Sequence, residues 1–391
     1  MPIQPAFGTK DLNPKEVEQN QHISSKLSCL YKQWGYEEVF PPKVERIETL
    51  VAGGGISNKD IVRLVADEPI GLRPELTASI ARASATRFAH IQRPLRLWAA
   101  GTVFKSKEDC DSKFTIEENL NSGVELIGIA GTAAEVELLY LLLEALNVLQ
   151  IDKDEKPTLL IGHKSLMKMI LEGYKSHDQI IIRKYLTDYD LISAESIKIE
   201  ERFKAKLLKV MKIRGEPKRV INQLVDIFGN NQIFDELSRL FKIIEPIANN
   251  HGVTIQLDPT YQSRYDLYTG LIFQLVCKNR FAPKVIASGG RYDDLVNIFG
   301  EKGRDEKGAG FSFSIDKIRE LKQKEKVPIN SSKRTLIAYD TNKRYEDALE
   351  QQLRLHKKGI TAMVELDPCE TEEYANEIKL KRGFDELIWV S

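Results

Sequence analysis

Glu75 and Thr77 are the first residues whose types and spacing could do chemistry. They lie in residues 71–78, GLRPELTA, where a predicted strand gives way to a helix. A carboxylate at such a junction could bind an ammonium group through a charge-assisted hydrogen bond. A purely structural interpretation competes, in which Thr77 caps the helix and Arg73 pairs with Glu75. Taken alone, this block favours the structural interpretation.

Asn121 and Glu125 belong to a second block, residues 119–126, whose alternation predicts a strand. Side chains two residues apart on a strand share a face, so these two residues face the same way as Asn119 and Gly123. Polar side chains around a glycine could hold a small polar ligand over a sheet. A solvated strand face explains the pattern equally well.

Tyr268 and Tyr292 lie in two further blocks that combine aromatic residues with glycines. Residues 265–273 predict a strand with Asp266, Tyr268 and Gly270 on one face, and a mid-strand glycine is unfavourable unless something approaches closely. An aromatic core strand with a bulge is the alternative. Residues 287–294, ASGGRYDD, predict a tight turn that could cover a pocket, and they match neither the phosphate-binding loop nor the dinucleotide fingerprint.

The sequence predicts some of the helices and strands that must position these blocks. A helix is predicted from Pro14, because Asn13 can cap it and Glu16 completes a capping box, and Gly35 ends it. A strand is predicted at 38–40 and a helix at 132–149. Between them, residues 61–125 predict mostly strands and turns. One strand is expected to be interrupted at 101–102, and a polar loop is expected at 105–113.

Two domains are expected, residues 1–325 and 331–391, joined by a polar linker at 322–333. Residues 163–250 are helical in pattern and poor in glycine and proline, which predicts an inserted helical subdomain. Strands are then predicted at 253–257, 265–277, 284–288 and 311–315, with a helix from Asp316. The alternation strand, helix, strand, helix, strand over residues 335–390 is typical of a small parallel sheet with crossover helices.

Composition excludes several classes. The chain has 391 residues, 42% of them hydrophobic, with 57 basic and 57 acidic side chains, so net charge predicts neither a nucleic-acid nor a membrane partner. The apolar stretches are too short for a membrane span, and residues 1–14 lack a secretory apolar segment. The four cysteines are scattered and no histidines have ligand spacing, so we expect a reducing cytoplasm, no metal site and no cofactor.

In order and spacing, these blocks resemble class II histidyl-tRNA synthetases over nearly the whole chain. The matching segments are residues 7–14, the motif-1-like 40–45, 72–77, the motif-2-like 97–105 and 119–125, the histidine-specific 265–270 and 289–293, and the motif-3-like 310–318. The resemblance implies an α/β (α+β) fold with a mixed, mainly antiparallel six-stranded sheet and flanking helices. It also implies a homodimer formed through the motif-1 region, and a small α/β C-terminal domain similar to a truncated anticodon-binding domain.

Four departures from the family bear on ATP. Where the family has arginines, this chain has Lys105, Lys317 and Ser263, and Lys107 replaces a glutamate. Fork-shaped guanidinium groups stabilise the charge that develops on the reacting phosphate, and lysine does not replace them at a bidentate site. We therefore expect a degraded ATP site and no catalytic residues.

The amino-acid pocket, by contrast, is retained. By resemblance, Glu75 and Thr77 would hold the α-amine of histidine and Asn121 would assist. Glu125 and Tyr268 would bind the imidazole nitrogens, and Tyr292 would line the pocket. No residue is assigned to the ligand carboxylate, because Ser263 removes the expected arginine.

A histidine pocket with a broken ATP site is similar to the family of non-catalytic synthetase paralogues that regulate ATP phosphoribosyltransferase. Membership implies a hetero-oligomer, usually octameric, with the short-form catalytic subunit of the first step of histidine biosynthesis, and histidine as a possible effector. The alternatives are an active histidyl-tRNA synthetase and a synthetase-like module that binds RNA or regulates another protein. Residues 331–391 carry 10 basic and 12 acidic side chains, so tRNA binding is not expected.

Overall fold

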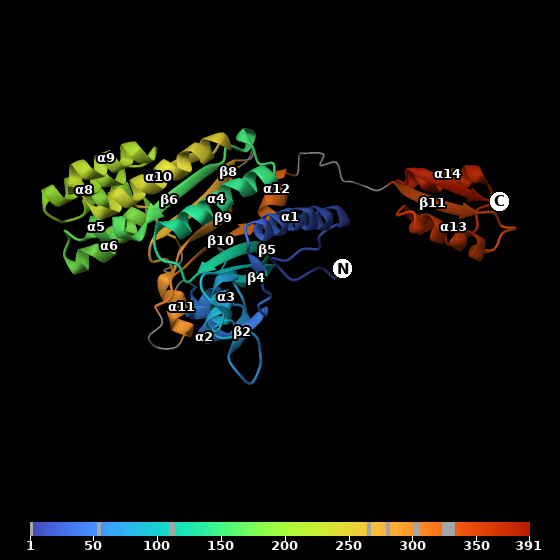
Figure 1. Ribbon diagram of the computed structural model, residues 1–391, viewed down its shortest axis with the longest axis horizontal. Coiled ribbons are helices and arrows are strands. Elements are labelled where there is room, and N and C mark those ends of the chain that lie inside the picture. Colours follow the sequence, from blue (N-terminus) through green and yellow to red (C-terminus); the bar gives the residue numbers. More distant parts are fainter. Residues whose placement is uncertain are drawn as a thin grey trace. The chain divides into compact units, whose positions relative to one another are not determined.

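The computed structural model describes residues 3–52, 56–108, 114–263, 267–278, 282–300, 305–322 and 333–391. Internal contacts divide the chain into two compact units, Met1–Lys322 and Gln323–Ser391 (Figure 1). Most of the predicted linker, residues 323–332, lies outside the described residues. None of the described helices is both long and apolar enough to cross a bilayer.

The first unit is built on an eight-stranded sheet. In spatial order the strands are β1 (Glu37–Glu38), β4 (Leu95–Glu108), β5 (Phe114–Ile127), β10 (Gly308–Ser314), β9 (Pro283–Arg291), β8 (Leu271–Lys278), β6 (Thr158–His163) and β7 (Thr254–Leu257). Within the described residues, only the β1–β4 and β6–β7 pairs of this sheet are parallel. The predicted mixed, mainly antiparallel sheet is confirmed, but the count of six strands is wrong. The short apolar run of β6 was not recognised as a strand.

Helices cover both faces of this sheet. On one face α1 (Pro14–Gln33), α4 (Thr132–Val148) and α12 (Ile315–Lys322) enclose the main hydrophobic core. The capping box of Asn13 and Glu16 that starts α1 is confirmed. On the other face lie α3 (Thr77–Ala85) and α11 (Asp293–Phe299), which bury a smaller cluster that includes Leu97 and Ile127.

A two-stranded sheet extends from the α3 side of the first unit. It pairs β2 (Val44–Arg46) with β3 (Ile70–Leu72), and α2 (Ile47–Val51) follows β2 directly. Arg82, in the last turn of α3, forms an ion pair with Glu45 of β2 at 2.8 Å. The helix therefore joins the small sheet to the large one.

Two predicted strand boundaries are wrong. The strand β4 runs unbroken through Gly101 and Thr102 to Glu108, because every residue from Leu95 onward pairs with β5. Residues 105–108, which were predicted to begin a loop, therefore belong to β4. The rest of the predicted loop, residues 109–113, lies outside the described residues. The strand β8 begins at Leu271, six residues after the predicted start, while Tyr265 and Asp266 lie outside the described residues.

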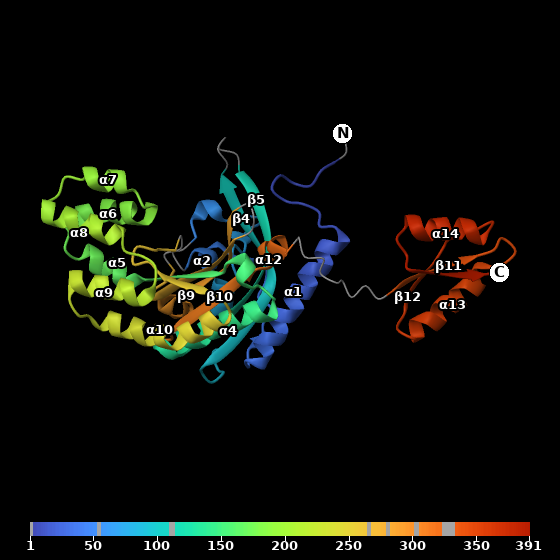
Figure 2. The ribbon, with the colours of Figure 1, turned by 90° about the horizontal axis from the view of Figure 1, so that it is seen from above.

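Six helices follow β6, as the helical pattern of residues 163–250 predicts; the first four bury an apolar cluster of their own, whereas the last two pack into the main core. They are α5 (Lys164–Leu171), α6 (Ser176–Asp188), α7 (Leu191–Ser196), α8 (Glu201–Met211), α9 (Pro217–Phe228) and α10 (Gln232–Asn250). Figure 2 shows these helices gathered beside the sheet. The 3-10 helices η1 (Asn58–Asp60) and η2 (Lys153–Glu155) complete the first unit.

The second unit is a three-stranded parallel sheet with a helix on each face. Its elements are β11 (Arg334–Tyr339), α13 (Tyr345–Lys357), β12 (Thr361–Val364), α14 (Glu372–Lys381) and β13 (Glu386–Val390), and the strand order is β12-β11-β13. The helix α13 packs on β12 and β11, and α14 packs on β13 and β11 (Figure 1). The predicted alternation of strands and helices is confirmed.

Candidate functional site

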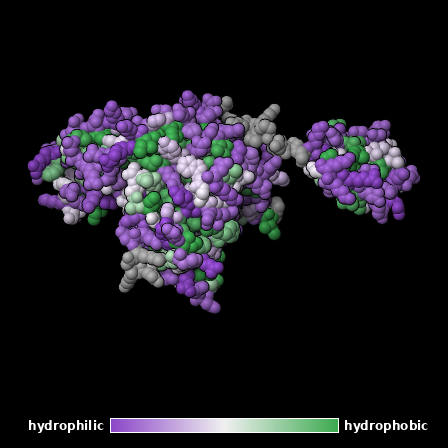
Figure 3. All heavy atoms as spheres, viewed as in Figure 1, coloured by the Kyte–Doolittle hydropathy of each residue, from purple (hydrophilic) through white to green (hydrophobic). Residues whose placement is uncertain are grey.

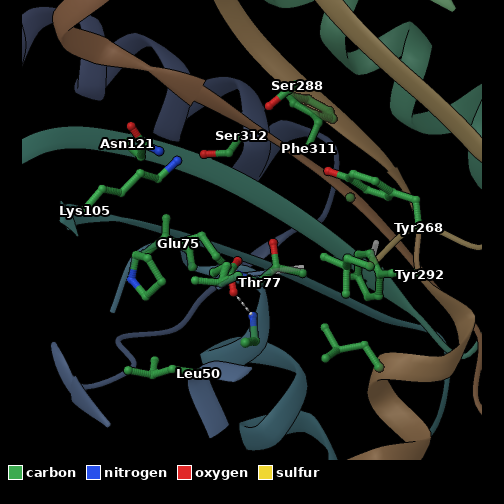
Figure 4. A pocket seen from close by; sticks show the side chains of 17 residues that line it. Leu50, Glu75, Thr77, Lys105, Asn121, Tyr268, Ser288, Tyr292, Phe311 and Ser312 are labelled. Atoms are coloured by element: carbon green, nitrogen blue, oxygen red, sulfur yellow. Dashed lines mark hydrogen bonds between the residues drawn. The ribbon is translucent and has the colours of Figure 1, made fainter. Parts of the chain in front are cut away.

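A cavity of about 100 Å³ opens between the large sheet and the start of α3. Its lining includes six residues singled out in the sequence, Glu75, Thr77, Lys105, Asn121, Tyr268 and Tyr292. Figure 4 shows Lys105 and Asn121 at one end, Tyr268 and Tyr292 at the other, and Glu75 with Thr77 between them. We call these ends the lysine end and the aromatic end. A cavity of this size holds several waters and is smaller than the roughly 300–1,000 Å³ of typical ligand pockets, so a metabolite would have to widen it.

Glu125 does not itself line the cavity but lies directly behind the lining residues Thr77 and Tyr292, and we call this buried layer the floor of the aromatic end. Its side chain is 2% exposed, and its carboxylate accepts hydrogen bonds from Thr77 Oγ1 at 2.6 Å and from the Tyr292 hydroxyl. Burial raises the pKa of Glu125 to about 8, an effect that these two hydrogen bonds oppose. Burial likewise holds the pKa of Tyr292 well above its usual value, so the phenol stays protonated and donates.

Glycines make room for this floor. Glu125, Gly310 and Gly290 lie side by side across β5, β10 and β9. A Cβ at Gly310 would stand 1.8 Å from Glu125 Oε2, and one at Gly290 would stand 2.6 Å from the ring of Tyr268. Both close approaches therefore require glycine. Gly290 belongs to the predicted GGRYD block, while the role of Gly310 was missed because it depends on register with β5.

Strand alternation brings a second row of small polar residues to the same face. Ser312 pairs with Gly123 on one side and with Ser288 on the other, and both serines line the cavity. The predicted alternation of residues 119–126 is confirmed, since Val124 and Leu126 are buried in the core on the opposite face. The serines were missed, although the alternating run of β10, GAGFSFS, carried the signal.

Glu75, not Thr77, caps α3. The Glu75 carboxylate accepts from the backbone N–H groups of Thr77 and, at 2.8 Å, of Ala78. Burial raises the pKa of Glu75, and these hydrogen bonds oppose the rise. The purely structural interpretation is wrong in detail, because the Thr77 hydroxyl turns to Glu125 and the guanidinium of Arg73 donates to the carbonyl oxygens of Pro41 and Thr102.

Asn121 Oδ1 is a buried acceptor with no hydrogen-bond partner within the described part of the chain. Leaving such an atom unsatisfied costs about 1–3 kcal/mol. Because Asn121 lines the cavity, a ligand donor or a water would satisfy it there.

Of the four residues of the predicted ATP site, Lys105 and Lys107 share β4, and Lys317 lies close to Lys105. Only Lys105 lines the cavity. Lys107 is two-thirds exposed and pairs with Glu117 at 2.9 Å across the β4–β5 hairpin. Burial and the neighbouring Lys105 lower the pKa of Lys317. Neither Lys107, Lys317 nor Ser263 contributes to the cavity lining.

The buried Arg291 of the GGRYD block has a positioning role. Its guanidinium donates to Glu135 at 2.9 Å, to Asp293 at 3.2 Å and to the carbonyl oxygen of Gly131 at 2.7 Å. These bonds fasten the end of β9 to the start of α4, so the adjacent Tyr292 is held at the cavity. Among the described residues, no group of three His, Cys, Asp or Glu side chains could hold a metal ion.

Comparisons with known proteins agree with this fold. The family model described as Histidyl-tRNA synthetase matches residues 8–318. A solved Bacillus halodurans chain, described as an ATP phosphoribosyltransferase regulatory subunit/histidyl-tRNA synthetase, is similar with a TM-score of 0.82 and 22% identity over 100% of this chain and 99% of that one. The fold, the cavity and the family match define the class: a histidyl-tRNA synthetase-like protein.

Curated relatives narrow the class further. An ATP phosphoribosyltransferase regulatory subunit of Prochlorococcus marinus is 63% identical over the full length of both chains. The protein of the same name from Synechococcus sp. (strain CC9902) is 45% identical, again over both full lengths. This chain therefore belongs to the ATP phosphoribosyltransferase regulatory subunit family.

Proposed function

We propose that this chain is a non-catalytic subunit that assembles in the cytoplasm with the short-form catalytic subunit of ATP phosphoribosyltransferase and makes its activity responsive to histidine. Full-length identity to proteins named as regulatory subunits supports the partner. The responsive element is the cavity over β5 and β10.

One observation carries the assignment of the ligand. The buried Glu125 carboxylate accepts hydrogen bonds from a threonine and a tyrosine hydroxyl behind the aromatic end of the cavity, and the unsatisfied Asn121 acceptor lies at the lysine end. Such a floor suits a ring that donates hydrogen bonds from nitrogen, as imidazole does. Histidine would place its ring over Glu125 and Tyr268 and its ammonium group near Glu75 and Thr77.

Lys105 completes the proposed site at the lysine end. A free amino acid has a carboxylate to place, and Lys105 is a cation in the lining at the end away from Tyr292. The ammonium of Lys105 also lies close enough to Glu75 to lower its pKa. A cation and a carboxylate close together in the lining suit the carboxylate and ammonium groups of an amino acid, which sit on one carbon.

Adenylate synthesis is the rival function, and the arrangement of the lysines argues against it. Lys107 is engaged with Glu117, Lys317 lies outside the cavity lining, and neither has the forked geometry that grips a triphosphate. Histidine-dependent exchange between ATP and pyrophosphate at an appreciable rate would reinstate a synthetase.

The test is reconstitution of the full chain with a short-form catalytic subunit. We expect co-purification, a higher rate of condensation of ATP with phosphoribosyl pyrophosphate, and inhibition by histidine. Calorimetry of the full chain alone with histidine tests the cavity separately. Failure to co-purify would overturn the partner, and absence of heat with histidine would overturn the ligand.

Two further expectations belong to the same proposal. We expect the chain to self-associate as a dimer within a hetero-octamer. The second unit would serve as a truncated anticodon-binding-like domain that does not bind tRNA, because residues 331–391 carry more acidic than basic side chains. Salt-sensitive tRNA binding near micromolar affinity would contradict the latter expectation.

A further inference from the structure

The edge strand β13 differs from the other edge strands in the described part of the chain. In the large sheet, β1 has two residues, both glutamates, and the four-residue β7 is bridged at Leu257 by Gly215. In the small sheet, β12 has four residues. The strand β13 has five, and four of them, LIWV, are consecutive and apolar. Natural proteins protect open edges with short strands, charges, prolines or bulges, and β13 has little of this protection.

The backbone of β13 has hydrogen-bonding groups that point outward. The Val390 carbonyl oxygen accepts from the Asp340 N–H at 3.0 Å, so the main-chain groups of Val390 point toward β11. Because these groups alternate along a strand, those of Leu387 and Trp389 point to the opposite edge. No strand in the described part of the chain pairs with that edge.

Both faces of β13 remain partly open. Leu387 and Trp389 pack on the α14 face, whereas Ile388 and Val390 lie on the other face, where α13 covers β12 and β11 instead. The last four residues of the strand are half-buried. Figure 3 shows hydrophobic residues gathered on the visible face of the second unit.

We propose that β13 pairs antiparallel with β13 of a second copy of this chain, joining two small sheets into one of six strands. With the two-fold axis at Ile388, Leu387 of each copy lies opposite Trp389 of the other. These are the residues whose main-chain groups face outward, so four hydrogen bonds form across the axis. Ile388 meets its own counterpart, and the interface is self-complementary, as two-fold symmetry requires.

Self-complementarity also favours this occupant over an unrelated strand. The pairing sets an aromatic side chain against an aliphatic one twice, and an aliphatic pair at the centre, with no like charges opposite each other. Glu386, the only charged residue of β13, forms an ion pair with Lys333 of its own chain at 3.0 Å. The inference does not depend on the ligand or the partner proposed above.

Charge reversal at the axis tests the pairing in the full chain. Ile388→Lys and Ile388→Glu each set two like charges face to face, so each variant alone should have half the mass of the wild type by light scattering at equal concentration. An equimolar mixture of the two variants should recover the wild-type mass, which a folding defect would not allow.

Val364→Lys is the matched control, because Val364 flanks Ile337 from the β12 side at the same level as Ile388. It should leave the mass unchanged. Equal mass for the wild type and both Ile388 variants, or a mixture that stays at the lower mass, overturns the proposal. Unchanged mass together with lost binding of the catalytic subunit also overturns it and assigns the edge to a strand of that partner.

Discussion

The aromatic and lysine ends of the cavity share the same strands but differ in how their polar groups are held. At the aromatic end, Glu125 is buried and bonded to Thr77 and Tyr292, with glycines shaped around it. At the lysine end, Lys105 lines the cavity, while its strand neighbour Lys107 points to solvent and pairs with Glu117. A preorganised buried network fixes one ligand geometry, whereas flexible ammonium groups set only a favourable potential. Under the proposed function, we expect the site to recognise a ring strictly and an anion loosely.

Gly310→Ala should break the aromatic end with the largest effect. The new methyl group would stand 1.8 Å from Glu125 Oε2 and 2.4 Å from the Val124 carbonyl oxygen, so the floor must shift. Overpacking of this kind costs about 1–3 kcal/mol, and we expect a loss at the upper end of that range in chemical denaturation. Gly300→Ala is the control, since its added Cβ meets nothing closer than 3.5 Å. Equal stability of the two variants would contradict the close packing.

At a pH above about 8, where Glu125 is ionised, Glu125→Gln should weaken histidine binding by roughly ten- to a hundredfold, the range expected for losing a hydrogen bond to a charged group. The amide keeps the size of the side chain, so the fold should survive. Calorimetric titration with histidine measures the effect, and circular dichroism checks the fold. An unchanged affinity would remove Glu125 from the proposed site.

The same substitution should change how stability depends on pH. The folded pKa of Glu125, about 8, lies above its ordinary value of 4.5, so the folded protein holds a proton that the unfolded chain releases between these values. The contribution of the protonated Glu125 side chain to the free energy of unfolding is therefore complete below about pH 4.5 and is lost as the pH rises toward 8. The unfolding free energy of the wild type relative to Glu125→Gln should fall by up to about 1.4 kcal/mol per pH unit in that window. A flat difference would mean that Glu125 titrates normally.

Lys105→Ala should have the smallest effect and sharpen the contrast between the ends. We expect a several-fold loss of histidine affinity with activation of the catalytic subunit largely intact, because an ammonium near a ligand anion contributes a modest, screened attraction. Lys107→Ala, on the same strand but exposed, should leave both unchanged. A large loss of activation in Lys105→Ala would show that the lysine end touches the partner.

The sequence predicted the elements with strong local signals and missed those defined by pairing. The capping box of α1 and the alternation of strands and helices from β11 to β13 depend on residues close together in the sequence, so both could be predicted. Gly101 looked like a break because a glycine weakens an isolated strand, yet pairing along the whole of β5 carries β4 through it. The short β6 has no turn or alternation signal strong enough to separate it from the helix that follows.

The residues of the candidate site also fall into those that the sequence predicted and those that only strand pairing reveals. Asn121 and Glu125 could be placed on one face by period alone, and Glu75, Thr77, Tyr268 and Tyr292 came from a resemblance to known motifs. Gly310, Ser288 and Ser312 could not be assigned, because their role arises from register between strands far apart in the sequence. The cap of α3 was given to Thr77 instead of Glu75, since composition does not tell which oxygen turns back to the helix.

The helix α3 is anchored at both ends, by Glu125 at Thr77 and by Glu45 at Arg82. Nine residues at 1.5 Å each make a stiff rod of about 13 Å. If an occupant drew Glu125 toward itself, the pull would pass through Thr77 and along α3 to Glu45 of the β2–β3 sheet. The helix α3 thus connects the cavity to the small β2–β3 sheet of the same unit.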